Sequence, residues 1–288
     1  MKGKGKVANY SASCDGVQVD SDGGLYALVV YSNGEGFNSF VYHLTDVASR
    51  NAPNQQNELL NVDLCLTDIR REGNGELFCS DNHGSIHRFQ GGSWAADPVS
   101  SKALTCVWSL PSGALLSAGE EGVVFRNEGS GWRPISPALG DNIFSIRGAS
   151  ESDLYVCGEG GLFWRFDGTA WTKIPLPTKE RLLGILAVSP DEVYVCGRGG
   201  ALFRGAGETW EDLSFSGHDF HGIEACAGQV VLAGAKEGIF QLDGADLVNI
   251  KNNISSYKLA SHEGYLASCG DNLAARREGE SWFGSRFS

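Results

Sequence analysis

The sequence predicts an all-β protein that folds as a single seven-bladed β-propeller of four-stranded antiparallel blades over residues 1–288. Two observations support this prediction: a phrase recurs along the chain at a short period, and its turns are rich in glycine. Each copy holds a strand ending in small residues, a Gly-rich turn, and a second strand followed by Gly. The residues that close the copies, 35 to 39 positions apart, are Trp94, Trp132, Trp171, Trp210, Leu247 and Trp282. Such a period indicates one supersecondary unit repeated many times.

The copy that ends in Trp171 shows how a single blade is built. Strands are predicted at residues 142–149, 154–158, 162–166 and 171–174, joined by polar or Gly-containing turns. These strands occupy the whole repeat and leave no room for a helix, which is typical of a propeller blade. The same plan predicts blades at about 1–61, 62–101, 102–140, 141–179, 180–217, 218–253 and 254–288.

The first blade lacks the Trp signature and is predicted from three strand-like segments, at residues 7–13, 25–32 and 37–44. Residues 46–57 are polar and are predicted as a surface loop before the next blade. Six blades preceded by an N-terminal hairpin remain an alternative. The segment 282–287 can complete the last blade by itself, so we expect the N-terminal strands to lie alongside it.

The repeated Trp is interpreted as structural, because a residue needed in every blade serves the blade. An indole between neighbouring sheets is required at each interface and buries a large apolar surface. A basic residue recurs six positions before it in most copies, and we expect its side chain to stack on the indole. These basic residues are Arg88, Arg126, Arg165, Arg204 and Arg276, with Gln241 in the copy that has Leu247.

The composition, and above all the net charge, indicates which kinds of partner the protein can bind. There are 35 acidic and 23 basic residues, giving a formal net charge of −12. This charge repels nucleic-acid phosphates and anionic membranes and speeds encounter with basic proteins. No 18-residue apolar run is present, so no membrane span is predicted. We expect a basic protein partner, no nucleic acid, no membrane and a monomeric protein.

The eight cysteines are predicted to be free core residues in a reduced, cytoplasmic protein. Cys157 and Cys196 occupy the same position in two copies, and no CxxC pair is present. The opening segment before Asp15 has no apolar region of the kind found in secretory signals.

No motif for catalysis, metal or cofactor binding stands out. His218 with His221, and His83 with His87, have spacings compatible with zinc, but neither pair has an evident third ligand, so surface histidines are expected. There is no G-x-S-x-G elbow, and the Gly-rich turns are hairpins rather than helix starts that could hold phosphate. We therefore expect no catalytic residues, no metal and no cofactor.

Function is expected on one face of the disc, where the turn between the second and third strands of a blade and the connector to the next blade emerge together. The candidate partner-binding residues on these turns are Asp81, His83, Glu120, Glu121, Asp141, Glu159, Arg198, Asp219, Phe220 and Asp271. Five of the acidic residues, Asp81, Glu120, Glu121, Asp141 and Glu159, cluster over three consecutive blades, and Phe220 is a candidate aromatic anchor. Trp108 and Arg147 are further candidate anchors nearer the channel. They share with Arg70 and Leu186 one inner-strand position that changes character between blades.

The phrase G-x-x-x-R-x-x-G-x-x-W resembles the repeats of bacterial propellers of the sialidase-type (BNR-like) and photosystem assembly-factor groups. The resemblance covers about residues 62–284 and implies the propeller fold. The segment 167–171 is similar to an Asp-box, but Asp167 and Gly168 adjoin, where that motif separates them by one residue. The resemblance therefore does not extend to a sialidase active site.

In overall character, the chain is also similar to propeller immunity proteins paired with antibacterial toxins, including those delivered by type VI secretion. This resemblance implies a non-enzymatic protein that occludes a basic toxin, such as a nuclease, with carboxylates placed where the toxin expects phosphates. The alternatives are an enzyme that uses the central cavity, such as a glycan hydrolase or lyase, and a general assembly scaffold.

Overall fold

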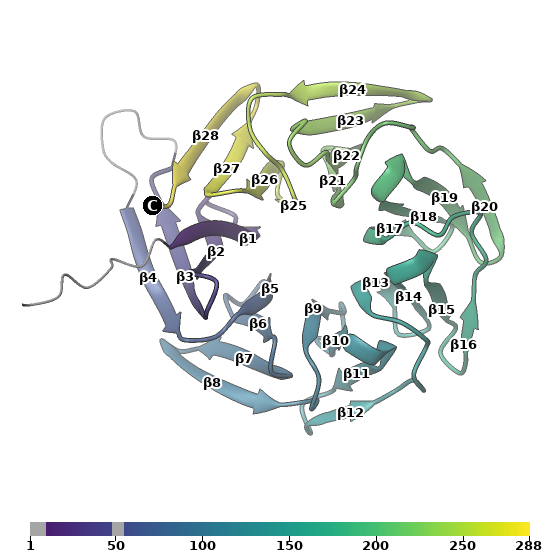
Figure 1. Ribbon diagram of the computed structural model, residues 1–288, viewed down its shortest axis with the longest axis horizontal. Helices are drawn as coiled ribbons and strands as arrows, with labels where there is room; N and C mark the ends of the chain where they lie inside the picture. The colour runs from purple at the N-terminus through teal and green to yellow at the C-terminus, as the bar shows by residue number, and fades with distance from the viewer. Residues whose placement is uncertain (1–9, 48–54) are drawn as a thin grey trace, which may run out of the picture.

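The computed structural model describes residues 10–47 and 55–288, whose strands form seven four-stranded antiparallel sheets arranged in a ring (Figure 1). In every sheet the strands are hydrogen-bonded in sequence order, and the first strand lies nearest the centre (Figure 1). The predicted seven-bladed β-propeller is confirmed, and the alternative of six blades with an N-terminal hairpin is wrong.

The first four blades run from the N-terminus to the middle of the chain. Blade 1 consists of β1 (Ser11–Val19), β2 (Leu25–Ser32), β3 (Phe37–Thr45) and β4 (Gln55–Val62). Blade 2 consists of β5 (Leu66–Arg71), β6 (Leu77–Asp81), β7 (Ser85–Gln90) and β8 (Ser93–Pro98). Blade 3 consists of β9 (Leu104–Ser109), β10 (Leu115–Gly119), β11 (Val124–Asn127) and β12 (Trp132–Pro134). Blade 4 consists of β13 (Ile143–Ser150), β14 (Asp153–Gly158), β15 (Phe163–Phe166) and β16 (Trp171–Lys173).

The last three blades complete the ring. Blade 5 consists of β17 (Leu182–Ser189), β18 (Glu192–Gly197), β19 (Leu202–Ala206) and β20 (Thr209–Asp212). Blade 6 consists of β21 (Gly222–Cys226), β22 (Gln229–Ala233), β23 (Ile239–Asp243) and β24 (Asp246–Lys251). Blade 7 consists of β25 (Lys258–His262), β26 (Tyr265–Gly270), β27 (Leu273–Glu278) and β28 (Ser281–Arg286).

The first blade differs from its prediction at two places. Its inner strand β1 runs over Ser11–Val19, past the predicted end at residue 13, because a bulge between Cys14 and Gly16 lets pairing with β2 continue. Residues 7–9 of the predicted strand, and residues 48–54 of the predicted loop, lie outside the described residues. The predicted loop was to end at residue 57, but β4 already begins at Gln55, which pairs with Thr45 of β3.

The ring closes by packing, since each sheet is built from one continuous segment of chain. The closing contact lies between β1 and β25–β26, where Cys14 and Val17 share a core cluster with Ala260 and Cys269. Hydrogen bonds cross the same junction: the Cys14 amide donates to the Asp271 carbonyl, Arg276 donates to the Gly23 carbonyl, and Gln56 donates to the Ser285 hydroxyl. The N-terminal blade therefore lies beside the C-terminal one, as predicted.

The repeated tryptophans pack against the blade that precedes their own. Trp210 of blade 5 meets Phe163 of blade 4 edge-on, with ring centroids 4.8 Å apart. Trp132 packs on Phe78 and Ile86 of blade 2 in the same way. The interpretation of the indole as an inter-blade wedge is confirmed, and it explains why the residue recurs.

The repeated arginines do not stack on these indoles, contrary to expectation. Their nearest aromatic rings come from the second strand of their own blade: Arg165 lies over Tyr155 at 5.9 Å and Arg276 over Tyr265 at 4.7 Å. Arg165 pairs directly across from Tyr155 in the sheet and donates a 2.8 Å hydrogen bond to the buried carboxylate of Asp153. The other arginines hold the same cross-strand position, but the residue that they face changes between Phe78, Leu116, Tyr194 and Ala267.

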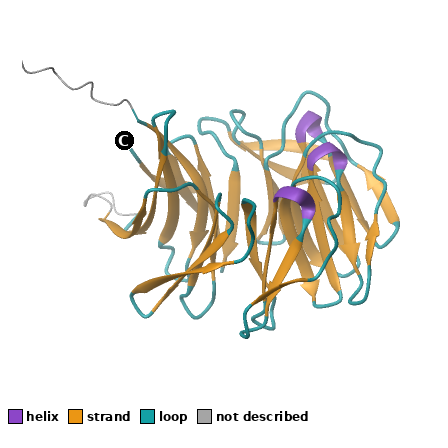
Figure 2. Cartoon of the chain, turned by 60° about the horizontal axis from the view of Figure 1, so that its bottom comes forward, coloured by secondary structure: helices purple, strands orange, loops and turns teal. Residues whose placement is uncertain are grey.

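The two faces of the disc differ. Three short 3-10 turns project from one face, η1 (Glu120–Gly122), η2 (Glu159–Gly161) and η3 (Arg198–Gly200) (Figure 2). We call this the upper face, and the opposite one, where first and second strands are joined, the lower face. Among the described residues, no helix has the length and hydropathy needed to span a bilayer.

Candidate functional site

The upper face carries the same turn in three consecutive blades. In each, the second residue has a left-handed conformation, with φ of 63° at Glu121, 61° at Gly160 and 64° at Gly199. The turns are fixed by backbone hydrogen bonds to the connector that enters the same blade, for example from the Glu159 amide to the Asn142 carbonyl at 2.9 Å. Connector side chains add to this, since Asp219 accepts a 2.8 Å bond from the Gly199 amide. The backbone of this rim is therefore constant while its side chains change.

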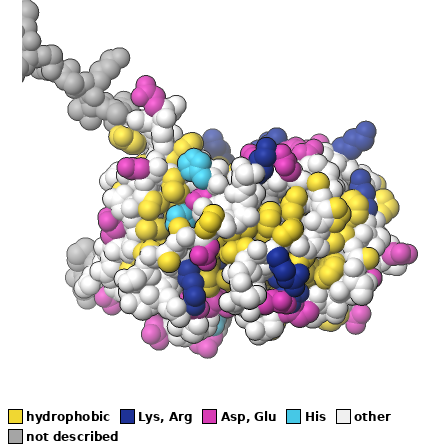
Figure 3. Space-filling model, turned by 90° about the horizontal axis from the view of Figure 1, so that it is seen from below, with side chains coloured by type: hydrophobic (Ala, Val, Ile, Leu, Met, Phe, Trp, Pro, Cys, Tyr) yellow, Lys and Arg dark blue, Asp and Glu magenta, His cyan; other side chains and the backbone are white. Residues whose placement is uncertain are grey.

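The acidic patch predicted on this rim is partly neutralised by neighbouring cations. Glu121 pairs with Lys102 at 2.7 Å, and Glu159 pairs with Arg181 at 2.7 Å. The exposed carboxylate of Glu120 forms no ion pair among the residues that the structure describes. In the edge-on view, acidic and basic side chains lie side by side along the upper edge (Figure 3). The rim therefore presents mixed charge rather than one acidic field.

Asp81 is not an exposed rim residue, because its side chain is only 2% exposed. Its carboxylate accepts hydrogen bonds from the amides of His83 and Ser85, both at 2.8 Å, and lies 2.8 Å from Nε2 of His87. Asp81 pairs with Leu66 at the position that Gly158 occupies opposite Ile143 in blade 4. It therefore stabilises the turn that follows β6.

Phe220 is fully buried and cannot serve as the predicted surface anchor. Its ring lies in a core cluster between blades 5 and 6, edge-on to Phe215 and Phe240 and stacked on His218 at 6.0 Å. The sequence places Phe220 on a connector, but the connector turns this side chain into the core.

The remaining rim candidates lie on the upper face as expected. His83 and Arg198 are exposed, and Asp141 accepts a 2.9 Å bond from the Asn142 amide at the end of the connector that enters blade 4. Asp271 accepts a hydrogen bond from the Ser255 hydroxyl. This bond joins the turn between β26 and β27 to the connector that enters blade 7. These contacts order the rim but bring no set of groups together for catalysis.

The histidine pairs are engaged with carboxylates rather than with each other. His87 is buried against Asp81, so it is not the surface histidine that the sequence suggested, and His218 lies 3.0 Å from Glu237. Within residues 10–47 and 55–288, no group of three potential metal ligands is found.

The predicted anchors Trp108 and Arg147 do not lie on the upper rim. They occupy the second halves of β9 and β13, and therefore face the central channel toward its lower end. The Trp108 ring contacts two guanidinium groups from the neighbouring blades, with Cζ of Arg70 3.9 Å and Cζ of Arg147 4.1 Å from its centroid. Both distances are those of cation–π contacts over a ring face.

These residues line a cavity of about 210 Å³ in the lower half of the channel. Glu224 of β21 belongs to it as well: its Oε1 accepts bonds from the Ala225 amide at 3.0 Å and from the Ser261 hydroxyl at 3.3 Å. Burial raises the pKa of Glu224 from 4.5, although Arg147 acts in the opposite direction. Burial also lowers the pKa of Arg70, and the nearby Arg147 lowers it further.

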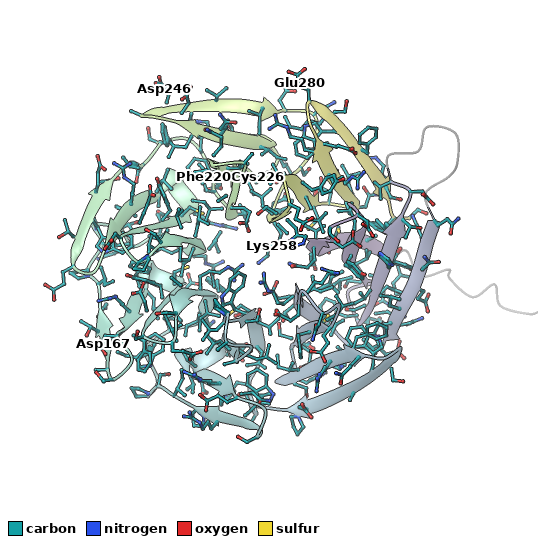
Figure 4. All side chains as sticks on the ribbon, turned by 180° about the vertical axis from the view of Figure 1, so that it is seen from behind. Asp167, Phe220, Cys226, Asp246, Lys258 and Glu280 are labelled. Atoms are coloured by element: carbon teal, nitrogen blue, oxygen red, sulfur yellow. The ribbon has the colours of Figure 1, made fainter. Side chains whose placement is uncertain are left out.

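A second cavity of about 520 Å³ lies toward the upper end of the channel. Lys258 lines both cavities and lies beside the channel in the view from behind, whereas Asp167, Asp246 and Glu280 lie at the periphery (Figure 4). Burial raises the pKa of Asp15 in the upper cavity, and Lys258 partly opposes this shift.

Glu224 is the functional candidate that the sequence reasoning missed. It pairs with Val231 as Leu186 pairs with Tyr194, so it occupies the variable inner-strand position already recognised in Arg70. The signal was present in the sequence. The hairpin of the first two strands is one residue shorter in blade 6 than in blade 5. Counting a constant number of residues from blade to blade therefore misses Glu224.

Comparison with known proteins shows the fold and no family. No protein-family model and no curated protein matches the chain. Among solved structures, the chain is similar to a catalytically inactive variant of virginiamycin B lyase from Staphylococcus aureus with quinupristin. The TM-score is 0.70 at 14% identity, over 97% of this chain and 95% of that chain.

Two further structures give the same result. Selenomethionine-substituted virginiamycin B lyase from Staphylococcus aureus matches with a TM-score of 0.69 at 13% identity, over 91% of this chain and 97% of that chain. The WD40 β-propeller domain of Doa1 matches with a TM-score of 0.72 at 8% identity, over 92% of this chain and 93% of that chain. At these identities the likeness is one of fold, that of the seven-bladed β-propeller.

Proposed function

We propose that this chain is a non-enzymatic binding protein whose upper face binds a protein partner. The observation that carries the proposal is the rim itself: η1, η2 and η3 repeat one backbone conformation while displaying Glu120, Glu159 and Arg198 at their equivalent first positions. A rigid backbone that varies only in its side chains suits recognition, because little conformational entropy is lost on binding.

The charge of the chain supports a basic partner. The net charge is −12, and Glu120 is an exposed rim carboxylate that forms no ion pair among the described residues. In finer terms, we propose a cytoplasmic immunity protein that occludes a basic antibacterial toxin, such as a nuclease delivered by type VI secretion. The rim carboxylates would then meet the basic groups of the toxin cleft, and their main effect would be on the association rate.

The test is affinity capture from the native host, using the unaltered protein, Glu120→Lys and a matched control. Asp191→Lys is that control, because Asp191 is exposed in the lower-face turn of blade 5 and its carboxylate forms no hydrogen bond or ion pair among the described residues. We expect the control to retain the partner and Glu120→Lys to associate several-fold more slowly at low salt. Equal association of all three proteins would contradict binding through the upper face.

The immunity proposal has its own test. The captured protein should arrest growth when expressed alone in a susceptible strain, and co-expression of this chain should restore growth. Capture of a partner that is harmless by itself would leave the upper-face proposal standing and overturn the immunity proposal.

A second candidate function, an enzyme that uses the channel, is favoured by the convergence of Arg70, Arg147 and Glu224 on one cavity. The fold is shared with virginiamycin B lyase, an enzyme by its name. Turnover of a small molecule that Glu224→Gln abolishes and Glu120→Lys leaves unchanged would favour this second function. Such an outcome would also place function at the channel rather than on the upper face.

A further inference from the structure

We propose that the lower half of the channel is a binding site for a small carboxylate-bearing molecule, with the guanidinium groups of Arg70 and Arg147 as its recognition groups. This site lies away from the upper face, and the proposal does not depend on the protein-binding function. It begins from the Trp108 ring, which contacts one guanidinium group from each neighbouring blade at 3.9 and 4.1 Å.

The positive charge at this place is only partly balanced by the protein, since the carboxylates of Asp68 and Glu224 line the same cavity. Arg147 donates one hydrogen bond, to the Ile146 carbonyl at 2.9 Å, and forms no ion pair within the described part of the chain. Arg70 uses Nε for both of its polar contacts, with Ser109 at 3.1 Å and with Glu72 at 3.4 Å. The terminal nitrogens of Arg70 are therefore left for another acceptor.

The indole ring holds the two like charges in place without neutralising them. Cation–π attraction leaves the guanidinium N–H groups able to donate hydrogen bonds. Nε1 of Trp108 is also buried without a hydrogen-bond partner in the described structure. Two guanidinium groups with unused donors thus meet at the cavity, and an anion would satisfy this arrangement. Arginine pairs with the planar carboxylate through two parallel hydrogen bonds.

Glu224 determines which anion fits. It lines the same cavity but forms no ion pair with either arginine, so space remains between the charges. A second negative group on the ligand would be repelled by this carboxylate, whereas a hydroxyl or ammonium group could donate to it. A cavity of about 210 Å³ has room for a small organic acid together with water. The preferred class is therefore a small hydroxy- or amino-monocarboxylate.

The experiment is calorimetric titration of the full chain with sodium glycolate, L-lactate, glycine, acetate and inorganic phosphate, at matched ionic strength. We expect glycolate, lactate or glycine to bind more tightly than acetate, because acetate offers no donor to Glu224. In Arg147→Met, which keeps an unbranched apolar stem and removes the guanidinium group, the affinity should fall at least about tenfold. In Arg198→Met, an exposed upper-face control, it should be unchanged.

Loss of binding through misfolding is separated from loss of recognition by two measurements. Arg147→Met should keep the circular dichroism spectrum of the unaltered protein and unfold in a single transition, with only a small loss of stability from the missing contact with Trp108. Glu224→Gln should reduce the preference for glycolate over acetate without abolishing acetate binding. Absence of carboxylate binding, binding insensitive to Arg147→Met, or a preference for phosphate would each overturn the proposal.

Discussion

The indole nitrogen of Trp171 donates a 3.0 Å hydrogen bond to the carbonyl oxygen of Ile135, which belongs to the preceding blade. Trp94 makes the equivalent 2.8 Å bond to Leu59 of blade 1. A single side chain thereby buries apolar surface against the neighbouring sheet and also satisfies a backbone carbonyl at its outer edge. Blade-to-blade cohesion is consequently concentrated at a few positions that can be tested one at a time.

Trp171→Ala should lower the free energy of unfolding by about 3 kcal/mol, since it removes a large ring from an inter-blade core. Trp171→Phe should lose less, about 1 to 2 kcal/mol, mainly because the Ile135 carbonyl loses its donor. Urea denaturation followed by circular dichroism measures both. Thr172→Ala at the exposed neighbouring residue is the control, and an unchanged curve for Trp171→Ala would refute the wedge.

The fold could be predicted because its determinants are local and repeated. Most blades carry a Gly-rich turn, and five carry the same indole. The period of the sequence is therefore the period of the structure. The first blade breaks this rule, and there the prediction was less accurate. Its inner strand contains the Cys14–Gly16 bulge, which shifts the alternation of side chains in a way that a simple period-two pattern does not anticipate.

The candidate site was predicted less well because the side chain of a turn residue can point either to solvent or into the core. Phe220 and Asp81 both lie in segments that emerge on the upper face, yet both side chains are buried. An aromatic ring on a connector finds an apolar cluster, and an Asp in place of the usual Gly satisfies amides within its own turn. The contact of Trp108 with two arginines joins residues from three blades, which requires the closed ring to be known.

Asp81 should make stability depend on pH in acid. Burial alone would raise its pKa, but the bonds from His87 and from the Ser85 and His83 amides outweigh this and hold the pKa below 3.8. A depressed carboxyl pKa stabilises the fold above the unfolded value, and that contribution is lost as pH falls through the folded value. The stability difference between the unaltered protein and Asp81→Asn should therefore shrink below about pH 4.

The measurement is guanidinium unfolding of both proteins at neutral pH and at several values below pH 4. Asp97→Asn provides the control, because Asp97 is exposed on β8 and its carboxylate forms no hydrogen bond or ion pair within the described residues. A difference between Asp81→Asn and the unaltered protein that stays constant with pH would mean that the carboxylate charge contributes nothing at this turn.

Gly158 should resist substitution for a reason other than a positive φ. Its φ is −171°, an extended conformation, but an added Cβ would meet the Asn142 carbonyl oxygen at 1.9 Å. Gly158→Ala should therefore destabilise the protein by about 1 to 3 kcal/mol through overpacking. Gly73→Ala, where a Cβ meets nothing within 4 Å, should be neutral or slightly stabilising in the same thermal denaturation assay. Equal losses of stability at the two positions would show that the close approach of the Asn142 carbonyl to Gly158 does not determine the cost of an added Cβ.

The cysteines should be slow to react while the protein is folded. Six are buried and only Cys65 and Cys226 are partly exposed. Burial raises the pKa of Cys65 to about 11 and that of Cys106 to about 12, so thiolate, the reactive form, is scarce near pH 8. Ellman's reagent should react slowly with two thiols in the native protein and rapidly with eight after unfolding. Cys65→Ser should remove one of the two native reactions, and Cys157→Ser should remove neither. Rapid labelling of more than two native thiols would show that the inter-blade cores open on the timescale of the reaction.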